Sequence, residues 1–268
     1  MENNNINKII KKIKKRMLTV EDYKFIQDSK GNKLLDKMLL YNNGKSWKII
    51  PLKTMLAYPI IYDKYETEKE TYDITIVLCP ITLMSTIFKG LFKLKTYQND
   101  KMILSEINND KVILPIDMGI KINSKFVIEK NKRLVVNITT LRNAMMTAPD
   151  ANILTCDKKK KSILKKSYYK DLNDIDGNVI NGLLHPKTLV YVIQFKHHST
   201  PDEKTKILMG KNISEKKVTG YDFSKSGISS YLTKYQEKII GNEGFIMPML
   251  WYMAKKIYSQ SEVINVSI

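Results

Sequence analysis

Short apolar runs separated by turn residues constrain the fold of this chain more than any other feature of its sequence. Between residues 46 and 122 such runs recur at intervals of about eight to twelve residues, with Gly, Asn-Asp and Pro between them. Each run is too short for a typical helix and rich in the residues that favour strands. The expected strands are residues 48–52, 58–62, 73–79, 85–94, 101–107 and 111–116. This pattern predicts a mostly antiparallel β region.

A helical stretch followed by a short strand occurs twice in the chain. The sequence TTLRNAMMTAPDANILTC predicts a helix at 139–147, ended by Pro149, and a strand at 152–156. PMLWYMAKKIYSQSEVINV has the same arrangement, and Leu141 precedes Ile153 by the same interval as Trp251 precedes Val263. In the second half, the clearest strand is 187–195. The repeat predicts an α+β fold with two related β-rich halves, each closed by a helix and a short strand.

The net charge of +18 arises from 45 basic and 27 acidic residues, and it is concentrated in two segments. Residues 1–40 carry ten basic and five acidic side chains, while residues 158–170 carry seven lysines and no acid. Such a charge distribution is typical of a folded body with basic appendages. The expected organisation is a basic N-terminal helical segment (1–44), a first β-rich half (45–157), a lysine-rich connector (158–184) and a second β-rich half (185–268).

The N-terminal segment has the pattern of a basic amphipathic helix. Basic residues surround an apolar stripe at helical spacing, formed by Ile6, Ile9, Ile10, Ile13 and Met17. Such a helix either docks on its own domain or binds an anionic membrane or nucleic acid. After it, Thr19 is a candidate N-cap for a second helix that runs through Ile26.

The lysine-rich connector is the candidate site for DNA or an acidic protein partner. Lysines that neutralise phosphates alternate there with tyrosines that stack on bases, and the candidate residues are Lys158, Lys159, Lys160, Lys161, Lys165, Lys166, Tyr168, Tyr169 and Lys170. Only three of the 45 basic residues are arginines, so base-specific recognition of guanine is not expected. The abundance of Lys, Asn and Ile is also typical of an AT-rich genome, which leaves a solvated connector as the alternative.

Catalytic and metal-binding patterns are weak. Cys79 lies between apolar residues that raise the pKa of a thiol, so a buried structural cysteine is the favoured interpretation and a reactive one the alternative. His197 and His198 are adjacent, so on a strand they point to opposite faces and do not readily share a metal ion. No phosphate-binding glycine motif occurs. We therefore expect no catalytic residues, no metal and no cofactor.

Four motifs follow one another along the chain. The first two are AYPI at 57–60 and CPIT at 79–82, and the third is the helix and Pro-Asp strand of 140–155. The fourth consists of the second-half elements that begin at PKTLVYV (186–192) and end at Trp251 and SEV (261–263). The residues that carry the motifs are Tyr58, Pro59, Cys79, Pro80, Thr82, Pro149, Asp150 and Trp251. In this order the motifs resemble a prokaryotic family of unknown function that carries a Cys-Pro-Leu-Thr or Cys-Pro-Leu-Cys motif. The resemblance covers the chain from about residue 45 and implies a fold, not a reaction.

The chain departs from this family between the first two motifs. The family has a Trp-His-Glu stretch there, whereas Tyr65 and Glu66 occupy this place and the first histidine is His185. The Lys, Asn and Ile usage is similar to that of giant DNA viruses. Together these features predict a non-enzymatic virion-associated or structural protein that binds DNA or acidic virion proteins; the alternative is a divergent thiol enzyme that uses Cys79. A virion or host-cytoplasm location follows, since no signal peptide or membrane-spanning run is present.

Overall fold

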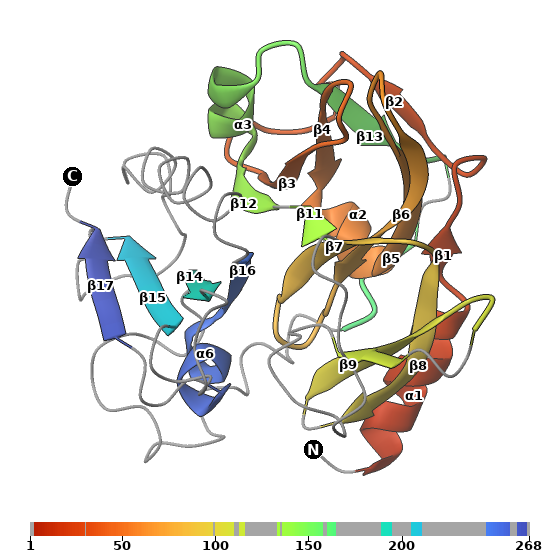
Figure 1. The fold of residues 1–268 in the computed structure, drawn as a ribbon, viewed down its shortest axis with the longest axis vertical. Coiled ribbons are helices and arrows are strands. Elements are labelled where there is room, and N and C mark those ends of the chain that lie inside the picture. Colours follow the sequence, from red (N-terminus) through yellow and green to blue (C-terminus); the bar gives the residue numbers. More distant parts are fainter. Residues whose placement is uncertain are drawn as a thin grey trace. The chain divides into compact units, whose positions relative to one another are not determined.

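The chain forms two compact units, Met1–Leu164 and Lys165–Ile268. Figure 1 shows the secondary structure of both units in a computed structural model. The residues that the structure describes are 3–29, 31–98, 100–109, 113–115, 133–134, 136–157, 160–164, 189–194, 205–210, 245–257 and 262–266.

The first unit is rich in short strands. Its described helices are α1 (Asn3–Lys14), α2 (Leu52–Ala57) and α3 (Leu141–Thr147). Its described strands are β1 (Met17–Leu18), β2 (Lys24–Ile26), β3 (Lys37–Asn42), β4 (Trp47–Pro51), β5 (Ile60–Glu66), β6 (Thr71–Leu78), β7 (Ser85–Lys89), β8 (Phe92–Gln98), β9 (Lys101–Glu106), β10 (Ile113–Pro115), β11 (Arg133–Leu134), β12 (Asn137–Thr140) and β13 (Asn152–Thr155).

These strands form three sheets with the orders β1-β5-β6-β7-β11, β10-β9-β8 and β12-β3-β4-β13-β2. The second unit has one described sheet, of order β16-β14-β15-β17. Its described elements are β14 (Leu189–Gln194), β15 (Thr205–Gly210), β16 (Phe245–Leu250), α6 (Trp251–Ile257) and β17 (Glu262–Val266). Among the described pairings, only β1–β5, β4–β13 and β15–β17 are parallel. The predicted α+β class with mostly antiparallel strands is therefore confirmed.

One sheet of the first unit shows the pattern of the predicted repeat. Leu40 of β3 pairs with Asn137 of β12 on one side and with Ile49 of β4 on the other. Ile49 in turn pairs in parallel with Ile153 of β13. The helix α3 joins the outer strand β12 to the strand β13 on the other side, so the chain crosses over the sheet between them.

The four described strands of the second unit's sheet match β12, β3, β4 and β13 in order, direction and register, while β2 is an additional strand of the first sheet. Val192 of β14 pairs with Met247 of β16 and with Ile207 of β15, and Ile207 pairs in parallel with Val263 of β17. The helix α6 joins β16 to β17, as α3 joins β12 to β13. The equal intervals seen in the sequence therefore correspond to equivalent positions in two sheets, since Ile153 and Val263 occupy matching places in the pairing.

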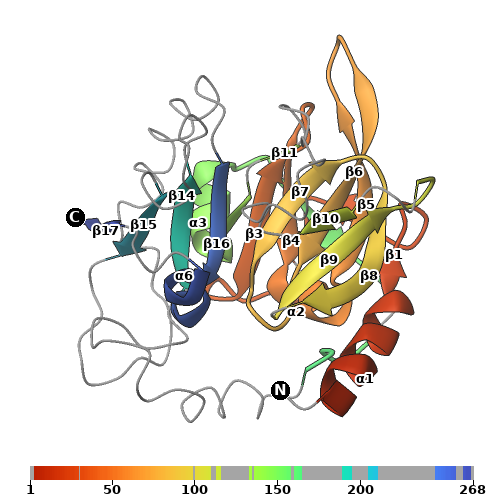
Figure 2. The ribbon, with the colours of Figure 1, turned by 60° about the horizontal axis from the view of Figure 1, so that its bottom comes forward.

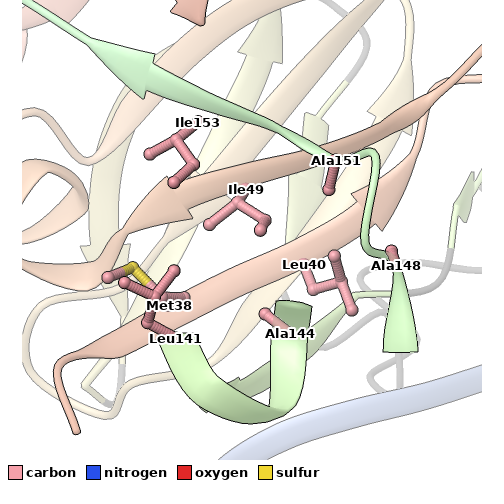
Figure 3. Packing of buried hydrophobic residues seen from close by; sticks show 8 residues of the cluster. All are labelled: Met38, Leu40, Ile49, Leu141, Ala144, Ala148, Ala151 and Ile153. Carbon is pink, nitrogen blue, oxygen red and sulfur yellow. The ribbon is translucent and has the colours of Figure 1, made fainter. Parts of the chain in front are cut away.

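Helix α3 and its sheet enclose a small apolar core in the first unit. A two-turn helix is not stable alone, so burial of its apolar side is what holds it on the sheet. The residues of this core come from β3, β4, α3, the turn after it and β13, and Figure 3 shows them packed together: Met38, Leu40, Ile49, Leu141, Ala144, Ala148, Ala151 and Ile153. The side-chain hydroxyl of Thr140 caps the helix by accepting from the Asn143 N–H.

Three local expectations were wrong. The helix expected to run through Ile26 is absent, because residues 24–26 form β2 and pair with β13. Among the described residues of segment 1–44, the helical ones are those of α1, and β1, β2 and β3 also lie within the segment. The run 85–94 is two strands, because Gly90 has a φ of 100° in the left-handed region that favours glycine, and the chain turns there.

Candidate polyanion-binding surface

Helix α1 is amphipathic, and its apolar side is buried within its own unit. Ile13 is fully buried and Ile9 nearly so, while Ile6 and Ile10 are half-buried. The helix packs against β8, beside which it lies in Figures 1 and 2. The prediction that the helix docks on its own domain is therefore confirmed for its apolar side, which leaves its basic side exposed. Its isoleucines cannot enter a bilayer unless the helix first leaves the domain.

The opposite side of α1 presents a continuous set of cations. Lys8, Lys11 and Lys15 recur at i, i+3 and i+7 and so lie on one face, and all three are exposed. No acidic residue occurs between residues 3 and 16. Lysines in the last turn of α1 also complement the partial negative charge of the helix C-terminus. The helix thus combines a buried apolar side with a positive side that contains no acidic residue of its own.

Residues 160–164 lie against this helix, although almost the whole first unit separates them from it in the sequence. Ile163 and Leu164 are buried, and the Ile163 N–H donates to the Leu56 carbonyl at 2.9 Å. On the other side, the guanidinium of Arg16 donates to the Lys161 carbonyl at 2.7 Å. The Lys12 ammonium also lies 3.5 Å from the Ile163 carbonyl. In Figure 2 this segment is the green trace beside α1.

The contacts between α1 and residues 160–164 join the two most basic parts of the sequence into one feature, here named the basic surface. Both segments lack acidic residues, so the cations reinforce one another's potential. The described residues of the basic surface are Lys8, Lys11, Lys12, Lys14, Lys15, Arg16, Lys160 and Lys161. Its array of point charges suits a polyanion whose negative charges repeat along its length.

The predicted lysine-rich site coincides with this surface in part. Lys160 and Lys161 are exposed at its edge. The remaining candidates, Lys158, Lys159, Lys165, Lys166, Tyr168, Tyr169 and Lys170, lie outside the described residues. The sequence prediction did not include the cations of α1 in this site. Their helical spacing was visible in the sequence, but nothing in the sequence showed that residue 16 meets residue 161.

Cys79 lies in a tight loop that joins β6 to β7. The Leu78 N–H donates to the Pro59 carbonyl, so the AYPI and CPIT motifs meet at one end of the sheet. The Cys79 N–H donates to the Met84 carbonyl and the Leu83 N–H donates back to the Cys79 carbonyl, both at 2.8 Å. To close this loop, Leu83 adopts a φ of 55° in the left-handed region. The loop is a compact structural turn.

The thiol of Cys79 is not arranged for nucleophilic chemistry. It is fully buried, and its sulfur lies 3.8 Å from both the Tyr97 hydroxyl and the Asp100 carbonyl. Burial raises the pKa of the Cys79 thiol; hydrogen bonds from Thr82 and Tyr97 oppose this rise without cancelling it. A thiol with a raised pKa remains protonated near neutral pH, whereas the nucleophile is the thiolate. Cys156 is half-buried, and neither cysteine forms a disulfide.

The other motif residues have structural positions. Tyr58 and Pro59 are buried between α2 and β5, while Pro149 and Asp150 form the exposed turn between α3 and β13. Trp251 is the fully buried first residue of α6 in the second unit. Within the first unit, Pro59 and Cys79 are brought close together, whereas Pro149 and Asp150 lie in a turn that leads into another sheet.

Within the described ranges, no group of three or more His, Cys, Asp or Glu side chains is placed to hold a metal ion. None of the described helices is long and apolar enough to cross a membrane. The chain matches no family model, no curated protein and no solved structure. Its charge, burial and hydrogen bonding are therefore the basis for a functional proposal.

Proposed function

We propose that this chain is a non-enzymatic virion-associated or structural protein of a large DNA virus, whose basic surface binds DNA non-specifically. The observation that carries the binding proposal is the convergence of α1 and residues 160–164, neither of which contains an acidic residue, into one basic surface. Lysines that neutralise phosphates release condensed counterions, which favours binding to any duplex regardless of its sequence. The viral origin rests on the Lys, Asn and Ile usage of the sequence alone.

One feature disfavours a membrane as the partner, and another suits a row of phosphates. The apolar side of α1 is occupied by its own domain, which removes the usual means by which an amphipathic helix enters a membrane. The cations are almost all lysines, which act as point charges and suit a regular row of phosphates. An acidic virion protein is the second partner class, and the experiment below separates it from DNA.

A salt titration of binding to a short duplex tests this proposal. Replacing Lys8, Lys11 and Lys15 together with Gln is expected to weaken binding and to reduce the log-log salt slope by up to about 0.9 for each phosphate that is no longer neutralised. The matched control replaces the exposed lysines Lys33, Lys45 and Lys69, which lie outside the basic surface, and changes the net charge equally. The control is expected to leave the slope close to that of the unmodified protein.

Two outcomes would contradict the proposal. Equal effects of the two triple variants would mean that only net charge matters, not the basic surface. Absence of duplex binding at low salt, together with binding to polyglutamate, would replace DNA with an acidic protein partner. Mass spectrometry of purified particles from the source, if that source is a virus, tests the virion association separately.

The alternative of a thiol enzyme lacks a supporting observation. Its requirement is a Cys79 thiolate with access to substrate, and the side chain is fully buried with a raised pKa. The resemblance to the Cys-Pro-Leu family remains a prediction about the fold and implies no enzymatic reaction.

A further inference from the structure

Arg16 differs from the other cations of the basic surface in what it contacts. Its side chain is half-buried, whereas the lysines of the surface are exposed. Its guanidinium donates to the Lys161 carbonyl at 2.7 Å, a shorter distance than the 3.5 Å between the Lys12 ammonium and the Ile163 carbonyl. An arginine whose fork binds a backbone carbonyl holds a chain segment in place instead of pointing freely at solvent.

Arg16 and Lys12 reach the same strip of backbone from the end of the helix. α1 ends at Lys14, and the Lys15 and Arg16 N–H groups then donate to the carbonyls of Lys12 and Ile13, three residues back, in a tighter turn. This turn keeps Arg16 close to the last turn of α1, which contains Lys12. The two side chains contact the carbonyls of Lys161 and Ile163.

The 160–164 segment is fixed differently at its two ends. Burial of Ile163 and Leu164 and the bond from the Ile163 N–H to the Leu56 carbonyl hold its second part. Lys160 and Lys161 precede this anchor and are exposed. The bond from Arg16 holds the backbone at this exposed end.

We infer that Arg16 is a positioning residue, which fixes Lys160 and Lys161 beside the lysines of α1 so that cations from both segments contact one DNA duplex. This inference rests on the proposed function, because it assigns the surface a duplex ligand. Its distinctive consequence is that loss of Arg16 removes more than one positive charge from the binding site. A lysine on the exposed face of α1 contributes only its own charge.

Comparison of Arg16→Gln with Lys15→Gln tests the inference, since each variant removes one cation from neighbouring positions. Lys15→Gln is expected to reduce the log-log salt slope for a short duplex by about 0.9. Arg16→Gln is expected to reduce it by about two to three times as much, because Lys160 and Lys161 also lose their fixed position. In a background that already carries Lys160→Gln and Lys161→Gln, the effect of Arg16→Gln is expected to shrink toward that of a single cation or less.

Hydrogen exchange in the absence of DNA supplies an independent measurement. Arg16→Gln is expected to accelerate exchange of the Ile163 amide, which donates to Leu56, because a short segment held at one end only opens more often than one held at both ends. Lys15→Gln is expected to leave this exchange unchanged. Unchanged protection at Ile163, or equal salt slopes for the two variants, would overturn the positioning role. Failure of the unmodified protein to bind any duplex would instead overturn the proposed function, and the Ile163 measurement tells these two failures apart. Thermal unfolding of both variants confirms that each remains folded.

Discussion

Lys37 occupies a strand position that is apolar in the other unit. It pairs with Thr140, the residue before α3, just as Leu189 pairs with Leu250, the residue before α6. Leu189 is buried, and Lys37 is partly buried as well. Burial lowers the pKa of Lys37 from 10.5 to about 8, because the charged ammonium loses part of its hydration in the fold.

Replacing Lys37 with Leu is expected to raise the free energy of unfolding at pH 7, by at most about 3 kcal/mol. Below pH 8 the folded state must hold a charged Lys37, so the cost of burying it is then complete. The cost declines as the pH rises from 8 to 10.5, because only the unfolded chain then stays protonated. The advantage of the variant is therefore expected to shrink over this interval, as measured by denaturant unfolding.

The exposed Lys33 supplies the control for this prediction. Lys33→Leu is expected to change the unfolding free energy little, and by the same amount at both ends of the pH range. A constant difference between Lys37→Leu and the unmodified protein from pH 7 to 10.5 would contradict the assigned role of burial.

Cys79 offers a second test at the level of single residues. In the native protein a thiol-reactive disulfide reagent is expected to label the half-buried Cys156 faster than the fully buried Cys79. The Cys156→Ser variant should therefore label slowly until denaturant is added, whereas Cys79→Ser should label as the native protein does. Rapid labelling of Cys156→Ser at neutral pH would revive the thiol-enzyme alternative.

Helix α1 is an element whose stability depends on packing rather than on its own propensity. Its 12 residues form a marginal helix in water, and most of its stability must come from the side that faces the domain. That side is centred on Ile13, which is fully buried, whereas Ile10 is only half-buried.

Truncation of these two isoleucines tests how firmly α1 is docked. Ile13→Ala is expected to lower the unfolding free energy by about 2–5 kcal/mol, through the burial it gives up and the cavity left behind. Ile10→Ala should cost clearly less, since part of its side chain already contacts water. Equal small effects in denaturant unfolding would show that the helix is not an integral part of the first unit.

The paired sheets show which element-level features were readable in advance. The strands at 48–52, 73–79 and 101–107 were predicted because alternating or continuous apolar runs mark strands with buried faces. The strand β2 was not predicted, because Thr19 and the acidic residues after it resemble the start of a helix but form a turn. The Thr19 hydroxyl and N–H both donate to the Asp22 carboxylate. These local hydrogen bonds compete with helix formation.

At the scale of the whole molecule, the scarcity of arginine determines what kind of DNA binding is expected. Arginine provides the bidentate contact that most often reads guanine, and the chain has only three arginines, one of which already binds a carbonyl. Two unrelated duplexes of equal length should therefore bind with the same affinity and the same salt slope. Replacing Lys158 to Lys161 with Ser should lower both slopes equally, by about one unit for each lysine that contacts a phosphate.

The measurement is a salt titration of both duplexes before and after the substitution. A slope that the substitution leaves unchanged would make this segment a solvated connector. A large difference between the two duplexes would contradict non-specific binding.

Periodicity and interval were sufficient to predict the β-rich class, the amphipathic nature of α1 and the equal spacing of the two helix and strand pairs. These are local properties of a chain, so they can be read without knowing how distant segments pack. The register of the two sheets confirmed that the equally spaced segments are structurally equivalent, since Ile153 and Val263 occupy matching positions.

The meeting of the basic segments and the surroundings of Cys79 could be seen only in the folded chain. Arg16 contacts Lys161 because the sheets between them return the chain to α1, and no local pattern encodes a contact over that separation. In the same way, the apolar neighbours of Cys79 suggested burial, but its contacts with Tyr97 and Asp100 arise from a strand and turn further along the chain. Long-range pairings depend on how all the elements pack together, so their geometry is fixed only in the folded protein.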